Sequence, residues 1–87
     1  MGYRKLRGVP LPYGKQGQIY FTCLNFSTAP VYIQRKIERL CESAGGEYAS
    51  ALMELVTTEK TVPQLAQKYY CSPETLARCR KEFYLAW

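Results

Sequence analysis

The chain has no histidine and no aspartate among its 87 residues, and both absences bear on catalysis. Histidine is the side chain that most often acts as a general acid or base near neutral pH. The sequence also has no glycine-rich loop for phosphates, and no cysteine has an obvious base beside it. We therefore expect a binding protein rather than an enzyme, with no cofactor and no small-molecule substrate.

Long apolar runs are absent as well. No run approaches the roughly 20 residues needed to span a bilayer. The N-terminal residues also lack the continuous apolar core of a signal peptide. We expect a soluble, cytoplasmic protein with no membrane partner.

The four cysteines form no Cys-x-x-Cys pair. A zinc site without histidine would need all four as ligands at unusual spacing, and three of them fall on helix faces with the pattern of a core. Disulfides are disfavoured in a reducing cytosol. The sequence thus predicts no metal site, and it predicts buried free thiols at Cys23, Cys41, Cys71 and Cys79.

Acidic residues are missing from the N-terminal end of the chain. The net charge is +5, from twelve Lys and Arg against seven acidic residues. Residues 1–18 hold four basic residues and no acid, residues 30–60 hold four against five, and residues 61–87 hold four against two. We therefore expect a polyanion to meet the two ends of the chain. A charge pattern that serves only solubility is the alternative.

Two short helical patterns fill the last 27 residues. The hydroxyl of Thr61 can accept from a first-turn amide while Gln64 reaches back, and Pro63 fits the first turn. This capping box predicts a helix from Thr61 to about Tyr70. Its apolar face holds Leu65, Ala66 and Tyr69.

A second helix has its own start signal at Ser72. The hydroxyl of Ser72 is a good N-cap, Pro73 fits the first helical position, and Glu74 places negative charge at the positive end of the helix dipole. Spacings of three and four predict two opposite faces along this helix. One holds Leu76, Cys79, Phe83 and Trp87, and the other holds Glu74, Arg78, Lys81 and Leu85.

At these residues the chain resembles the helix-turn-helix superfamily, in small regulators whose motif reads roughly L-A-x-x-Y-x-V-S-x-x-T-L-x-R-x-R. The positions of that motif are occupied in order by Leu65, Ala66, Tyr69, Cys71, Ser72, Thr75, Leu76, Arg78 and Arg80. The resemblance implies a DNA-binding helix-turn-helix at residues 61–84. One departure is Tyr70, where the family often has glycine; a left-handed tyrosine costs roughly 1–2 kcal/mol.

The wider pattern is similar to small proteins carried by phages and mobile elements of Gram-positive bacteria. That resemblance implies a transcriptional regulator of such an element, or a DNA-recognition subunit of packaging machinery similar to a small terminase. A helical protein-interaction adaptor without DNA binding is the competing class. An ordinary helical hairpin with no nucleic-acid role is the simplest alternative.

Two further helical patterns precede the motif, one from about Pro30 to Ala44 and one from about Glu47 to Thr58. They supply apolar stripes for a core. The sequence therefore predicts a mainly α fold, with a four-helix domain over residues 30–87.

Residues 1–29 have a different pattern. Gln18–Phe26 is a run of β-formers that follows a glycine-flanked turn at Gly14–Gly17. We expect an extended or β-hairpin segment there, preceded by a flexible basic arm up to Lys15.

If the helix that begins at Pro73 enters the major groove, its first turns face the base edges. We expect Arg78 to contact guanine, Glu74 to accept from a cytosine amine, and Ala77 to touch a thymine methyl. The full set of expected base-reading residues is Ser72, Glu74, Thr75, Ala77 and Arg78. Phosphate contacts are expected from Lys68, Arg80, Lys81, Arg4, Lys5 and Arg7.

The expected partner is double-stranded DNA in the nucleoid. Because a single module of this size binds modestly, we expect a homodimer or a higher homo-oligomer.

Overall fold

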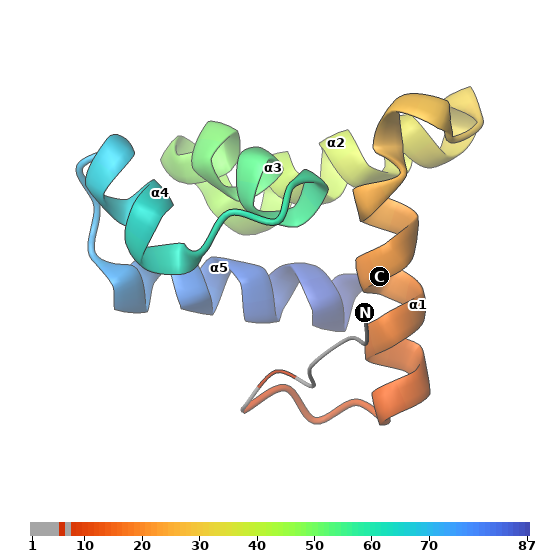
Figure 1. Ribbon diagram of the computed structural model, residues 1–87, viewed down its shortest axis with the longest axis horizontal. Coiled ribbons are helices and arrows are strands. Elements are labelled where there is room, and N and C mark those ends of the chain that lie inside the picture. Colours follow the sequence, from red (N-terminus) through yellow and green to blue (C-terminus); the bar gives the residue numbers. More distant parts are fainter. Residues whose placement is uncertain (1–5, 7) are drawn as a thin grey trace.

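In the computed structural model, which describes Leu6 and residues 8–87, helices follow one another along most of the chain (Figure 1). The α-helices are α1 (Tyr13–Leu24), α2 (Val31–Gly45), α3 (Ala49–Thr57), α4 (Val62–Lys68) and α5 (Pro73–Ala86). Short 3-10 turns at Phe26–Thr28 and Gly46–Tyr48 precede α2 and α3. The described residues contain no strand, so the mainly α class predicted from the sequence is confirmed.

Helices α2 to α5 correspond to the four helices predicted within residues 30–87. On α2, Ile37 and Cys41 are buried one turn apart, as the apolar stripe requires. The helix ends at a glycine pair, where Gly46 has a φ of +56° that glycine adopts without a steric penalty. The buried residues of α3 are Ala51, Leu52, Leu55 and Val56.

The helices pack around one core. Helices α2 and α3 lie against each other, α5 packs across both, and α4 contacts α3 and α5. Figure 1 shows α5 running below α2, α3 and α4, with α1 crossing near the C-terminal end of α5. Large side chains from every α-helix are fully buried, namely Ile19, Ile37, Leu52, Leu65, Leu76 and Phe83.

The prediction of an extended or β-hairpin segment at 18–26 is wrong, because most of that segment belongs to α1. Its β-branched and aromatic residues have strand propensity, but that propensity is weak against tertiary burial. Gln16, Ile19 and Cys23 recur at helical spacing and are all buried. Packing against α3 therefore decides the conformation of this segment.

The interpretation of the residues before α1 as a flexible arm is also wrong from Val9 onward. Val9 is buried, and the side chain of Gln16 holds the segment. The Gln16 Oε1 atom accepts from the Leu6 amide at 2.8 Å. Its Nε2 atom donates to the carbonyls of Val9 and Leu11, at 3.1 and 3.0 Å. A buried amide with these bonds is well satisfied, which fixes residues 8–12 on α1.

The aromatic C-terminal end is covered within the chain. Trp87 is half-buried and its ring centroid lies 6.0 Å from that of Phe83. The Lys36 Nζ atom of α2 lies 4.2 Å from the Trp87 ring centroid, in a cation–π contact. The end of α5 is thus tied to α2.

Candidate nucleic-acid interface

Helix α4 begins with the capping box that the sequence predicts. The Gln64 amide donates to Thr61 Oγ1 at 3.4 Å, and the Thr61 amide donates to Gln64 Oε1 at 2.8 Å. Two amides that have no partner within the helix are satisfied in this way. Leu65 and Ala66 then bury the inner face of α4.

The end of α4 is a Schellman motif. The Cys71 amide donates to the Ala66 carbonyl at 3.0 Å, and the Tyr70 amide donates to the Gln67 carbonyl at 3.4 Å. This pair of bonds requires a left-handed residue, and Tyr70 supplies it with a φ of +55°. The side chain of Tyr70 is 95% exposed. The turn therefore keeps the geometry that glycine usually provides, but with tyrosine in that place.

Helix α5 starts at its own cap. The Thr75 amide donates to Ser72 Oγ at 3.0 Å, and Pro73 occupies the first turn. Glu74 adds an acid to that turn, where the helix dipole favours negative charge. The N-cap function of Ser72 predicted from the sequence is confirmed.

The two faces predicted for α5 are those observed. Leu76, Cys79 and Phe83 are buried, and α5 packs on α2 and α3. On the opposite face, Arg78 and Lys81 are exposed. The exposed residues of that face are Glu74, Arg78, Lys81, Glu82 and Leu85.

The expected base-reading residues lie on the first turns of α5 and on its cap. Ser72, Glu74 and Arg78 are exposed, while Thr75 and Ala77 are half-buried at the flanks of the exposed face. The hydroxyl of Ser72 is also within 2.9 Å of the Thr75 hydroxyl. The structure thus brings these five residues together at one end of one helix.

Arg80 does not share the exposed face. It lies about 100° around α5 from Lys81, is half-buried, and lines a small pocket with Tyr20, Thr58 and Tyr84. Lys81 is therefore better placed than Arg80 for a phosphate that approaches the exposed face of α5. Arg4, Lys5 and Arg7 lie outside the residues that the structure describes.

Lys68 is engaged with a carboxylate of α3. Its Nζ atom lies 2.8 Å from Oε1 and 3.1 Å from Oε2 of Glu54. Lys60 also pairs with Glu54, and the Tyr69 hydroxyl donates to Glu54 Oε1 at 2.7 Å. Hydrogen bonds from Lys60, Lys68 and Tyr69 lower the pKa of the Glu54 carboxyl from 4.5 to about 2. We call Glu54 with Lys60, Lys68 and Tyr69 the Glu54 cluster.

The Glu54 cluster was missed by reasoning from the sequence. Its members are 6, 14 and 15 positions from Glu54, so no spacing within one helix predicts their contact. The cluster joins α3 to α4 and to the segment between them. It also neutralises a lysine that the sequence assigns to phosphate binding.

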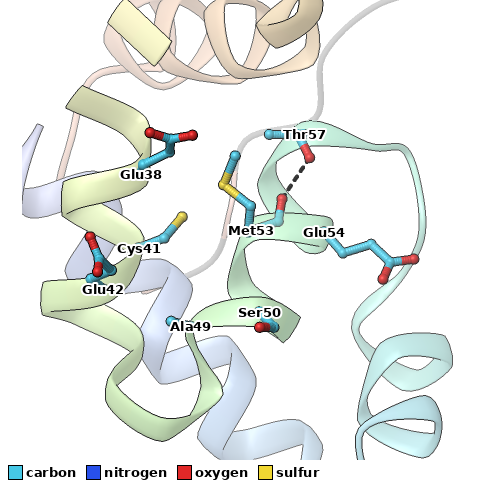
Figure 2. Close-up of a pocket in the computed structure, with 8 residues that line it drawn as sticks. All are labelled: Glu38, Cys41, Glu42, Ala49, Ser50, Met53, Glu54 and Thr57. Carbon is cyan, nitrogen blue, oxygen red and sulfur yellow. Dashed lines mark hydrogen bonds between the residues drawn. The ribbon is translucent and has the colours of Figure 1, made fainter. Parts of the chain in front are cut away.

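An acidic groove lies between α2 and α3 (Figure 2). Its volume is about 670 Å³, and Cys41 and Met53 point into it. Glu38 and Glu42 stand on the α2 side, and α5 runs behind the groove in Figure 2. The groove therefore opens away from the exposed face of α5, and its charge repels a polyanion.

The four cysteines are free thiols; Cys23, Cys41 and Cys79 are buried, as the sequence predicts, whereas Cys71 is only half-buried. Burial raises the pKa values of Cys23 and Cys41 to about 12, with a smaller contribution from the Cys41 thiol at Cys23 and from Glu38 and Glu42 at Cys41. Both thiols are therefore poor nucleophiles. Within the described residues, no group of three or more cysteine and acidic side chains is placed to hold a metal ion. In that same part of the chain, no helix is both long enough and apolar enough to cross a bilayer.

A scan against protein-family models, a search of curated proteins and a search of solved structures each gave no match.

Proposed function

We propose that the protein binds double-stranded DNA through a helix-turn-helix formed by α4 and α5, with α5 in the major groove. The observation that carries the proposal is the exposed face of α5, where Arg78 and Lys81 are presented by a helix whose other face is fixed in the core. The four-residue connection between Lys68 and Pro73 and the separate caps of the two helices fit this motif.

The dimensions of α5 also fit. Its 14 residues span about 21 Å, and the major groove of B-DNA is about 12 Å wide, enough to admit a helix. In Figure 1, α2, α3 and α4 all lie on one side of α5. The outer side of the helix is the side that we propose faces the DNA.

The five expected base-reading residues and Lys81 each have a chemical role in the proposal. Arg78 donates two hydrogen bonds to guanine, Glu74 accepts from a cytosine amine, and Ala77 contacts a thymine methyl. Ser72 and Thr75 lie at the start of the helix, where hydroxyls bind phosphates or bases. Lys81 holds a phosphate further along.

The exposed face of α5 carries no net charge in one protomer. Glu74 and Glu82 offset Arg78 and Lys81 on the exposed face, and Lys68 is paired with Glu54. One protomer therefore supplies few phosphate contacts, so we propose that the protein acts as a homodimer or a higher homo-oligomer. Arg4, Lys5 and Arg7 remain in the proposal as further phosphate contacts, on the basis of their charge alone.

We further propose a regulatory rather than a catalytic role in the nucleoid: transcription control of a phage or mobile element. DNA recognition in a packaging complex is the alternative. The acidic groove between α2 and α3 favours a third candidate, a protein-interaction adaptor, because an apolar floor beside carboxylates suits a basic partner segment.

Binding to a fluorescent random-sequence duplex over a range of salt concentrations separates the DNA-binding candidates from the adaptor. For DNA binding, the affinity falls steeply and linearly on a logarithmic scale as salt rises. Absence of binding at low salt would remove DNA from the proposal and leave the adaptor. Selection from a random duplex pool then distinguishes a palindromic, direct-repeat or absent motif, and so the symmetry of the oligomer.

A further inference from the structure

Tyr70 combines two unfavourable features in one residue. It is the one non-glycine residue with a positive φ among the described residues, and its side chain is 95% exposed. Left-handed backbone is disfavoured for tyrosine because its Cβ crowds the following carbonyl, a penalty that glycine avoids. An exposed ring contributes almost no burial in return.

The turn itself does not require the ring. Both Schellman bonds of the α4 end are made by backbone atoms, and glycine would make them without strain. In the described part of the chain, the Tyr70 side chain has no hydrogen-bond, ion-pair or ring partner. Its neighbour Tyr69 differs, because the Tyr69 hydroxyl points inward to Glu54. Neither fold nor stability accounts for a tyrosine at this position.

The position of Tyr70 in the chain offers a functional reason for a tyrosine there. Ser72, the N-cap of α5, follows two residues later, so the exposed Tyr70 lies in the turn that leads into α5. In a helix-turn-helix complex that end of the helix is closest to the bases, and phosphates line both sides of the groove. Strained residues gather at functional sites because the rest of the fold holds them there.

We propose that Tyr70 is a DNA-contact residue whose phenol hydroxyl donates to a backbone phosphate beside the groove that α5 enters. This inference rests on the proposed function. A duplex keeps its bases stacked, so the sugar–phosphate backbone is the part that a side chain outside the groove meets first. Tyrosine hydroxyls are among the groups that bind phosphate oxygens in protein–DNA complexes.

The test exploits the opposite effects expected on stability and on binding. Tyr70→Gly raises the melting temperature, because the strain is removed. The same variant binds a duplex roughly tenfold more weakly, the usual effect of losing a hydrogen bond to a charged group. Tyr70→Phe keeps the ring and loses the hydroxyl, so most of the weakening appears there as well. Tyr32→Phe, which removes the hydroxyl of an exposed tyrosine on α2, leaves the affinity unchanged.

The outcomes distinguish this inference from the proposed function. If the wild-type protein binds DNA and Tyr70→Gly binds equally well, Tyr70 is not a contact residue and the proposed function stands. A Tyr70→Gly variant that both melts earlier and binds more weakly assigns Tyr70 a structural role and overturns the inference. If the wild-type protein binds no duplex at low salt, the proposed function fails and this inference fails with it.

Discussion

Lys68 Nζ lies 2.8 Å from Glu54 Oε1 and 3.1 Å from Glu54 Oε2, so one ammonium group on α4 bridges both oxygens of a carboxylate on α3. The contact joins α3 and α4, and no local pattern in the sequence predicts it. It also neutralises a lysine that the sequence assigns to phosphate binding. Two lysines that look alike in the sequence, Lys68 and Lys81, therefore differ in how freely they can contact a phosphate.

Lysines at positions 81 and 68 should differ in their effect on salt dependence. Each phosphate contact contributes about one unit to the slope of log affinity against log salt, so Lys81→Ala should lower the slope by about one. Lys68→Ala should change it much less, because Glu54 already neutralises Lys68. Salt titrations of both variants on one duplex measure the difference. Equal losses of slope would show that Lys68 leaves Glu54 when DNA binds.

The Glu54 cluster should make stability depend on acid pH. The folded-state pKa of Glu54 is lowered from 4.5 to about 2. The contribution of the ionised carboxylate to folding stability is therefore fully present above pH 4.5 and is lost as the pH falls toward 2. Urea midpoints of wild type and Glu54→Gln should differ at neutral pH and converge over that interval. Glu42→Gln is the matched control, because Glu42 is an exposed carboxylate that lines the α2–α3 groove together with Glu54. If the urea midpoints of wild type and Glu54→Gln differed by the same amount at every pH, the lowered pKa of Glu54 would not be the source of the pH dependence.

Arg78→Ala should weaken specific binding by about 1–3 kcal/mol and relax the preference at one base pair. The reason is the loss of a bidentate contact to guanine. Arg35→Ala removes the same charge from an exposed position on α2 and should leave the preference intact. Competition between the selected site and its single-base variants measures both effects. Unchanged discrimination in Arg78→Ala would exclude Arg78 as a reader.

Thr61→Ala should lower the free energy of unfolding by about 1 kcal/mol, because it breaks the capping box that starts α4. Ser43→Ala, at an exposed position inside α2, should have a much smaller effect. Chemical denaturation of the two variants provides the comparison. Equal midpoints would show that α4 does not depend on its cap.

Local signals predicted the existence and approximate bounds of α2 to α5. Caps, glycine ends and apolar spacing each involve residues that are close together in the sequence. Ser72 and the opposite faces of Leu76 and Arg78 followed from such signals alone. The α1 segment did not, because its Ile19 and Cys23 take a helical conformation through contacts with distant residues. The Glu54 cluster was hidden for the same reason: its contacts join residues that are remote in sequence.

A map of backbone amide signals in the isotope-labelled protein, recorded as a duplex is added, shows directly which residues contact DNA. We predict that the chemical-shift changes concentrate from Tyr70 to Glu82, along the turn and the exposed face of α5. Signals at Cys41, Ala49 and Met53 in the α2–α3 groove should change little. Shifts centred on that groove, or no shifts at low salt, would contradict the claim that α5 is the DNA-binding helix.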